Sequence, residues 1–421
     1  MAKPPAARTA LAVLTGVNLL NYIDRYIPAG ALPLILATFS VSDTKGGLLQ
    51  SLFMFPYAIV SPLAGALGDR RRRFGVAGAG VLIWSVATFA SGLAPTFALL
   101  MVARVIIGIG EASYSVVTPP LLADYYPPSK RTGVLTIFYA ALPMGSALGF
   151  VVGGVLGTHL GWRAAFFVAG VPGLLLAVAL LAFRDPPRRG ATLAPAHGPT
   201  TGQPQPGWGQ LLRFPSYLSN VTAQTIYTFA IGGMAAWMPT YVCRERGLPL
   251  ARASLIFGGI VCVAGFVGTI AGGKLTDAVG RRSRVAAFTV SGGALLLSAP
   301  FTWLAILSPT PIVFWPAMFL TLMLLFVNTG PLNAAMTNVL PPSVQARGFG
   351  ACVMAMHLLG DALSPLLIGF ASSKMGLRLP LAATGMLPII AGLVLLAGRG
   401  GFERDLRRAD LSPPAAGGRS A

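Results

Sequence analysis

Residues 65–73 read GALGDRRRR and residues 273–281 read GKLTDAVGR, so one short pattern occurs twice in the chain. At a single offset of 208 residues, Gly, Leu, Asp and Arg recur at the first, third, fifth and ninth positions of the two stretches. A loop that is repeated at matching places is typical of membrane proteins built by duplication. Strongly apolar segments flank both copies, so we expect two related halves.

The composition predicts a protein embedded in a lipid bilayer. Hydrophobic residues make up 54% of the 421 residues and charged residues only 10%, with a mean hydropathy of +0.71, whereas soluble domains carry roughly 25% charged residues. About 20 apolar residues cross the bilayer core as a helix. Windows of this length predict an all-α membrane protein with twelve spans, near residues 10–36, 46–68, 75–94, 97–119, 132–157, 163–183, 216–241, 253–276, 285–307, 312–340, 347–373 and 378–398.

A polar stretch divides the predicted spans into two groups of six. Residues 185–209 are rich in Pro, Gly, Thr and Gln and lack an apolar period. We therefore expect an organisation in four parts, which are an N-terminal six-helix bundle (1–184), a cytoplasmic linker (185–212), a C-terminal six-helix bundle (213–399) and a cytoplasmic tail (400–421).

The distribution of the 31 Lys and Arg residues predicts the orientation of the chain in the membrane. With the N-terminus inside, 22 of them lie in cytoplasmic segments, 7 lie outside and 2 lie within spans. By the positive-inside rule, both termini are expected in the cytoplasm. This distribution also accounts for the net charge of +19 without a nucleic-acid partner. The bias toward Ala, Arg and Gly is consistent with a multi-pass protein of a bacterial inner membrane.

The sequence has no pattern typical of a cofactor site or of an active site. Cys243, Cys262 and Cys352 have no paired spacing, so neither a disulfide framework nor a metal site is predicted. No set of nucleophile, base and orienting residue occurs, because Ser113 has no nearby His. We expect no cofactor and no enzyme activity. A channel is disfavoured as well, because it would favour pore-lining repeats over two halves joined by a linker.

The repeated loop resembles the G-x-L-x-D-x-x-G-R signature of the major facilitator superfamily, which implies two pseudosymmetric six-helix bundles. The first copy departs from the signature because Arg72 replaces the second glycine. Asp69 is expected at a helix terminus, where it can pair with arginines in only one conformation. We predict that the loops control conformational gating through Gly65, Asp69, Arg73, Asp277 and Arg281. A simple anchor for the positive-inside rule is the alternative, but it explains only the arginines.

Two further segments are similar to signatures of the same superfamily. Arg104 and Gly108 match the R-x-x-x-G signature of the fourth span. Residues 145–154, which read GSALGFVVGG, resemble the antiporter motif of the fifth span, except that Phe150 stands where proline is expected. The glycines of this segment recur every four residues on one helix face, and close helix packing is their favoured meaning.

Within the superfamily, the first and fourth predicted spans resemble the spinster family of lipid transporters. The resemblance rests on residues 21–30, which read NYIDRYIPAG, and residues 108–114, which read GIGEASY. It implies a transporter that moves lysophospholipids or sphingoid-like lipids, with protons as the coupling ion. We also expect the protein to be a monomer. A proton/drug antiporter or an organic-anion carrier of the same superfamily is the alternative.

Charged residues inside the predicted spans indicate the candidate functional site. Among the twelve acidic residues, only Asp24, Glu111 and Asp361 lie well inside spans. A charge at bilayer depth costs roughly 3 kcal/mol or more unless it faces protein or water. Asp24 and Arg25 are neighbours, so a helix points them about 100° apart, toward different partners.

We predict that Asp24, Arg25, Arg104 and Glu111 form one proton-coupling network. Arg104 and Glu111 are seven residues apart and share a helix face. Burial disfavours the charged form of a carboxylate and a nearby Arg favours it, so an Arg that moves could load and unload a proton. A static ion network that fixes helix packing is the alternative interpretation.

Polar residues in other spans are predicted to contact the substrate. Gly330 and Pro331 interrupt the tenth span, and a break of this kind normally lines a cavity. His357 and Asp361 are four residues apart and are expected to share a face, either for a headgroup, for a second proton or for packing. The predicted substrate-binding residues are Asn21, Tyr114, Gln224, Tyr227, Asn328, Asn333, His357 and Asp361.

Overall fold

The computed structural model describes residues 5–187 and 208–411, and within these ranges the regular structure is entirely helical. Most of the predicted linker, at 188–207, and the end of the predicted tail, at 412–421, lie outside the described residues. The helices of the first half are α1 (Ala7–Gly30), α2 (Leu32–Phe39), α3 (Asp43–Arg70), α4 (Arg73–Leu93), α5 (Phe97–Tyr125), α6 (Pro128–Val151), the π-helical segment η1 (Val152–Leu156), α7 (Gly157–Leu160) and α8 (Trp162–Ala182).

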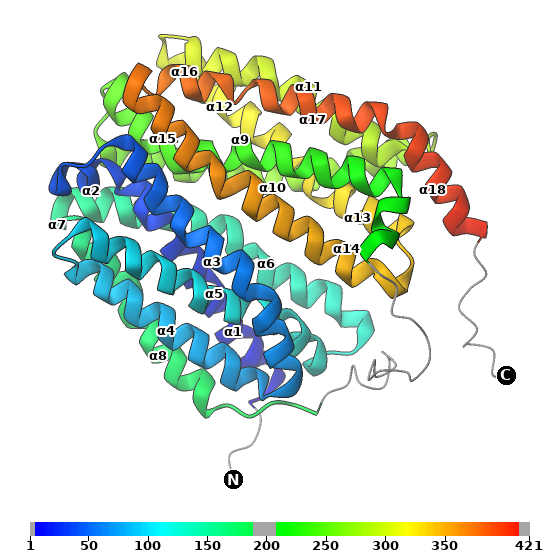
Figure 1. The fold of residues 1–421 in the computed structure, drawn as a ribbon, viewed down its shortest axis with the longest axis horizontal. Coiled ribbons are helices and arrows are strands. Elements are labelled where there is room, and N and C mark those ends of the chain that lie inside the picture. The colour runs from blue at the N-terminus through cyan, green and yellow to red at the C-terminus, as the bar shows by residue number, and fades with distance from the viewer. Residues whose placement is uncertain (1–4, 188–207, 412–421) are drawn as a thin grey trace. The chain divides into compact units, whose positions relative to one another are not determined.

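The second half repeats this pattern with more interruptions (Figure 1). Its elements are the 3₁₀ turn η3 (Trp208–Arg213), α9 (Pro215–Arg246), α10 (Leu250–Gly280), α11 (Ala286–Leu307), α12 (Pro311–Phe326), α13 (Thr329–Val339), α14 (Pro342–Ala355), the π-helical segment η4 (Met356–Asp361), α15 (Leu363–Met375), α16 (Arg378–Ala383), α17 (Met386–Ala397) and α18 (Arg399–Leu411).

Ten helical stretches of the described chain are long and apolar enough to cross a membrane. The two other predicted spans are α1 and α9, of 24 and 32 residues, and both exceed the length that a bilayer requires. Their polar residues, which include Asp24 and Arg25 in α1, lower their mean hydropathy. Length therefore identifies these two spans where hydropathy alone does not.

The predicted interruption of the tenth span is present. Helix α12 ends at Phe326 and α13 begins at Thr329, with a turn at residues 327–328. The eleventh span is interrupted as well, because η4 separates α14 from α15. π-Helical turns are rare in proteins overall, and those that occur are often found at functional sites.

The chain forms two compact units, and each takes in parts of several helices. Of the described residues, the first unit takes in 5–187, 232–263 and 361–381, and the second takes in 208–231, 264–360 and 382–411. The predicted boundaries at residues 184 and 213 stay a prediction.

Close helix packing holds the first unit together. Helix α4 lies between α5 and α8, and α1 packs along α6 (Figure 1). The glycine face of α6 meets α1, because a Cβ atom on Gly149 would lie only 2.6 Å from the Ile23 carbonyl oxygen. Phe150, which replaces the expected proline, is fully buried, and its ring packs against Tyr26 and Phe257. The contacts show that this segment packs helices together, as the glycine spacing predicted.

Parts of α9, α10 and α15 also pack on N-terminal helices within the first unit. Arg244 forms an ion pair with Asp43, with 2.7 Å between Nη1 and Oδ1. Ser372 donates a hydrogen bond to the other carboxylate oxygen of Asp43, at 2.7 Å. The Trp237 indole donates to the Pro365 carbonyl oxygen at 2.9 Å. Polar contacts thus join residues that are far apart in the sequence.

Candidate functional site

A buried ion pair connects α1 with α5. The Nη2 atom of Arg25 lies 3.1 Å from Oε2 of Glu111, and the two side chains are 10% and 0% exposed. Gly108, one turn before Glu111 on α5, allows α3 to approach closely, because a Cβ atom there would lie 2.3 Å from the Phe53 carbonyl oxygen. The sequence predicted that these charges lie near each other, and the structure places Arg25 directly on Glu111.

Asp24 points to a different helix from its neighbour Arg25. Its side chain is buried, and its Oδ2 atom accepts a hydrogen bond from the Thr88 hydroxyl of α4 at 3.3 Å. The predicted angular separation of adjacent helical residues explains the two directions. The Asp24 carboxylate also interacts electrostatically with Glu111 and with Arg104. The four charges therefore form one buried cluster, which we call the charged cluster (Asp24, Arg25, Arg104 and Glu111).

Arg104 differs from Arg25 in its surroundings. Only 1% of Arg104 is exposed, yet no described residue accepts a hydrogen bond from any of its three side-chain nitrogens. Its guanidinium carbon lies 4.7 Å from the centre of the Phe53 ring. Buried donors without acceptors cost free energy. The charges of the acidic residues in the charged cluster and the Phe53 ring offset part of this cost for Arg104.

Three aromatic rings surround the guanidinium of Arg25, and sequence reasoning missed them. Its central carbon lies 5.0 Å from each of the ring centres of Tyr22, Phe53 and Tyr57. Phe53 also contacts Arg104 and so connects the two arginines. The spacing of Tyr22 three residues before Arg25, and of Phe53 four residues before Tyr57, was the available signal. A desolvated cation gains stabilisation from such rings.

Two predicted substrate residues of the first half lie beside the charged cluster. Asn21 is buried and lies near Glu111, and its side-chain nitrogen has no hydrogen-bond partner among the described residues. The Tyr114 hydroxyl donates to the Leu14 carbonyl oxygen of α1, and its ring packs edge-on against Trp84. Tyr114 therefore ties α5 to α1, and Asn21 lies close to the ionised groups.

Three predicted substrate residues of the second half form hydrogen bonds within the second unit. Gln224 donates to Asn220 Oδ1 at 2.9 Å, and Asn328 donates to the Leu325 carbonyl oxygen at 3.1 Å. Asn333 is exposed and donates to the Thr329 carbonyl oxygen at 2.8 Å, whereas Tyr227 is buried. These contacts position Gln224, Asn328 and Asn333 through neighbours that are close in the sequence.

His357 and Asp361 both lie in η4. Their predicted shared face assumed an α-helix, in which residues four apart are neighbours. The segment is π-helical instead, and hydrogen bonds in such a helix join each residue to the fifth one along the chain. A Cβ atom on Gly232 would lie 2.6 Å from Asp361 Cβ, so Asp361 is close to the backbone of α9.

The first repeated loop forms a network of charges between α3, α4 and α5. Arg73 lies 2.7 Å from Asp124 and 3.6 Å from Asp69, so Asp69 pairs with an arginine of its own loop. Asp185 accepts hydrogen bonds from the backbone N–H groups of Arg73 and Phe74, at 2.6 and 2.9 Å. A carboxylate at a helix N-terminus is stabilising. Sequence reasoning identified Asp69 and Arg73 but missed Asp124 and Asp185.

The second repeated loop has a simpler structure. Asp277 and Arg281 are exposed, and within the described part of the chain neither forms a side-chain ion pair. Their contact is a backbone hydrogen bond from Arg281 N–H to the Asp277 carbonyl oxygen, at 3.3 Å. The same sequence pattern thus closes a network in one half and a turn in the other.

Comparison with known proteins assigns the family. The model of the Major Facilitator Superfamily matches residues 14–365. Protein spinster homolog 1 of Xenopus laevis is 32% identical, over 95% of this chain and 82% of its own length. The sphingosine-1-phosphate transporter SPNS2 of Mus musculus is 34% identical, over 86% of this chain and 69% of its own length. The chain belongs to the spinster family of the major facilitator superfamily.

A solved spinster structure has the same fold. A bacterial homologue of the human lysosomal transporter Spinster, in an inward-facing and unoccupied conformation, superposes with a TM-score of 0.83 over 98% of this chain and 100% of its own, at 24% identity. The predicted all-α membrane fold of the major facilitator type is therefore confirmed. The chain of 421 residues is therefore a multi-pass membrane transporter of this family and not an enzyme.

Proposed function

We propose that this transporter couples proton movement to the transport of an amphipathic lipid, such as a lysophospholipid or a sphingoid-like lipid. The observation that carries the proposal is the charged cluster, which places two carboxylates and two arginines inside the membrane-spanning helices. The name of the SPNS2 relatives, sphingosine-1-phosphate transporter, supports a lipid with one charged end. Alternating access between two six-helix bundles would carry the substrate across.

Glu111 and Asp24 are the proposed proton carriers, and Arg25 and Arg104 set their affinity. When Glu111 takes a proton, its attraction to Arg25 weakens, while the rings of Tyr22, Phe53 and Tyr57 continue to hold the cation. Arg104 has no hydrogen-bond acceptor among the described residues, so it can pair with a carboxylate of the charged cluster that has lost its proton. Exchange of this kind couples protonation to a movement of α1 against α5.

The substrate-binding set remains our proposal as predicted. Asn21 and Tyr114 lie beside the charged cluster, and Asp361 lies against α9. His357 stands in the same π-helical segment as Asp361, and π-helical turns are frequent at functional sites. Gln224, Tyr227, Asn328 and Asn333 complete the set. A polar headgroup can exchange hydrogen bonds with such side chains in place of their present partners.

Gating is proposed for the two repeated loops. In the first loop, Arg73 is held by Asp69 and Asp124, and a change of conformation that separates α3 from α5 would break one of these pairs. In the second loop, Asp277 and Arg281 are exposed and can form such pairs in another state. The cytoplasmic location of both loops and termini, in a bacterial inner membrane, belongs to the same proposal.

The deciding experiment is transport in proteoliposomes with an imposed pH gradient. Lysophospholipids, sphingoid bases, cationic dyes and organic anions are offered as separate substrates. We expect accumulation of a lysolipid or a sphingoid base. If neither lipid is transported but a dye or an organic anion is, the result would favour the drug antiporter or the anion carrier.

The matched pair of variants Glu111→Gln and Glu403→Gln isolates the coupling residue. Glu111→Gln should abolish accumulation driven by the gradient and leave exchange of labelled for unlabelled substrate intact, because exchange requires no net proton movement. Glu403 lies on α18 in an exposed pair with Arg407, so its amide variant should behave as wild type. Full proton-driven accumulation by Glu111→Gln would overturn the proposal.

A further inference from the structure

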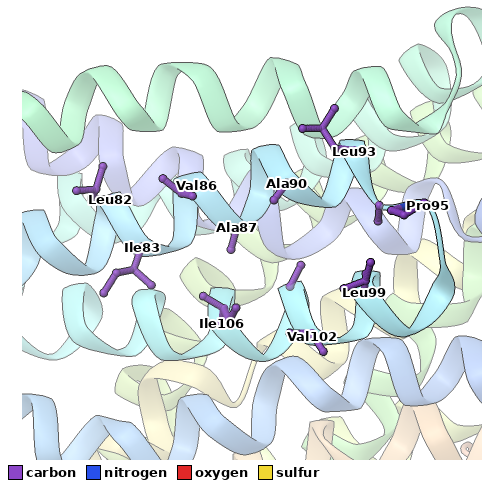
Figure 2. A pocket seen from close by; sticks show the side chains of 12 residues that line it. Leu82, Ile83, Val86, Ala87, Ala90, Leu93, Pro95, Leu99, Val102 and Ile106 are labelled. Carbon is purple, nitrogen blue, oxygen red and sulfur yellow. The ribbon is translucent and has the colours of Figure 1, made fainter.

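An apolar groove of 590 Å³ lies on the surface between α4 and α5 (Figure 2). Its volume is within the range of pockets that hold small ligands. Large exposed side chains, among them Val86 and Val102, form its rims, and the buried alanines Ala87, Ala94 and Ala103 form its floor. Its whole lining is Leu82, Ile83, Val86, Ala87, Ala90, Leu93, Ala94, Pro95, Leu99, Val102, Ala103 and Ile106.

The groove has the length of one leaflet. On α4 it runs from Leu82 to Leu93, a span of about 16 Å at 1.5 Å per residue. Half of the roughly 30 Å hydrocarbon core of a bilayer is about 15 Å. The groove ends at the turn between α4 and α5, where both helices end, and the lengths of these spans place this turn at the membrane surface. An acyl chain of one leaflet therefore matches the groove from the surface to the bilayer centre.

A cation is fixed at the surface end of the groove. Arg163, in the first turn of α8, donates a hydrogen bond from Nη2 to the carbonyl oxygen of Ala94, at 3.1 Å. Ala94 itself lines the groove. The guanidinium lies 4.4 Å from the Trp162 ring centre, and no acidic side chain of the described chain pairs with it. A positioned guanidinium that lacks a carboxylate is suited to a phosphate.

We propose that the groove binds one phospholipid, which belongs to the leaflet whose surface lies at the turn between α4 and α5. One acyl chain fills the groove between the two helices, and the phosphate accepts hydrogen bonds from Arg163. The lipid is a resident of the bilayer and a separate ligand from the transported substrate. All of its contacts lie on α4, α5 and α8, and none of the residues that line the groove belongs to the charged cluster. The inference therefore stands independently of proton coupling and substrate choice.

Native mass spectrometry of the full chain in detergent tests this site. The probes are palmitoyl-oleoyl phosphatidylglycerol and palmitoyl-oleoyl glycerol, which has the same chains and no phosphate. We expect the phospholipid to bind at a lower lipid concentration than the diacylglycerol, because its affinity is higher. Arg163→Gln should weaken phospholipid binding about tenfold and leave the diacylglycerol unaffected, because one charge-assisted interaction is removed.

Two further variants test the groove itself. Ala90→Phe fills the groove from an exposed position and should weaken both lipids about tenfold. Leu175→Phe enlarges an equally apolar position on α8 that is 70% exposed and outside the groove, and it should change neither affinity. Thermal unfolding of each variant without added lipid verifies its fold. Unchanged phospholipid affinity in both Arg163→Gln and Ala90→Phe, or equal losses for the two lipids in Arg163→Gln, would overturn the site.

Discussion

In the first half of the chain, α1 and α5 bring charges together, whereas the corresponding interior of the second half contains amides. Asn220 of α9 donates to the Leu332 carbonyl oxygen at 2.8 Å and accepts from Gln224 at 2.9 Å. In the charged cluster, by contrast, the three nitrogens of Arg104 and one oxygen each of Asp24 and Glu111 have no hydrogen-bond partner among the described residues. The difference teaches that two halves with the same helical pattern can differ in their interiors, because one holds buried charges with open hydrogen-bond positions and the other holds amides that bond to each other and to the backbone.

The largest expected effect is that of Arg25→Gln, because it leaves the Glu111 carboxylate buried without its ion-pair partner. Breaking a buried pair costs about 3–5 kcal/mol. Protonation of Glu111 removes the unpaired charge, so the loss of stability should be greater at pH 8 than at pH 5. Thermal unfolding of the detergent-solubilised protein at both values measures it. Arg407→Gln, which breaks an exposed pair on α18, is the control and should change stability by less than about 0.5 kcal/mol.

The two repeated loops sharpen the same contrast with a smaller effect. Asp124→Asn weakens the ion pair with Arg73, whose side chain is only 14% exposed, and should reduce stability by about 2 kcal/mol. Asp277→Asn changes an exposed side chain and should stay within about 0.5 kcal/mol. Thermal unfolding of the two variants side by side provides the comparison. Equal losses would mean that the loops are equivalent in the folded protein.

A still smaller effect is expected for the amide network of the second half. Asn220→Ala removes the donor to Leu332 and the acceptor for Gln224, and hydrogen bonds between membrane helices are worth about 1 kcal/mol. Stability should fall by about this amount, while the pH profile of transport stays that of wild type. A shifted pH profile would show that the second half also takes part in coupling.

The smallest change in stability is expected for Arg104→Met. The guanidinium of Arg104 has no hydrogen-bond acceptor in the described structure, and methionine fills a similar apolar volume beside Phe53. One fewer positive charge makes the carboxylates of the cluster easier to protonate, so the pH profile of transport should move to higher pH. Uptake measured from pH 5 to pH 9 gives the profile. Wild-type pH dependence in this variant would remove Arg104 from the coupling scheme.

Sequence reasoning predicted the fold where local signals are strong. Apolar length identified the spans, and the repeat at 65–73 and 273–281 identified the duplication. Gly330 and Pro331 predicted the break in the tenth span, since both disturb a helix. The π-helical form of η4 was not predicted, because its sequence contains no comparable breaker before Gly360.

The candidate site was predicted in its charges and missed in its surroundings. Asp24 and Arg25 were expected to point apart, since adjacent residues of a helix do, and they contact Thr88 and Glu111. Thr88 itself, the aromatic rings around Arg25, and the roles of Asp124 and Asp185 were not predicted. Their residue types are common in membrane helices and become informative only when another helix is placed against them.

The sequence by itself determined that this chain is a membrane protein, that it is duplicated, and that Asp24, Arg25, Arg104 and Glu111 lie inside its spans. These properties follow from composition and local spacing, because lipid excludes unpaired charge and a helix has a constant period. Only the tertiary structure decided that Glu111 pairs with Arg25 while Arg104 has no hydrogen-bond acceptor, and that an arginine of α8 stands at the end of a groove between α4 and α5. Such pairings join residues far apart in sequence, and they depend on how helices pack.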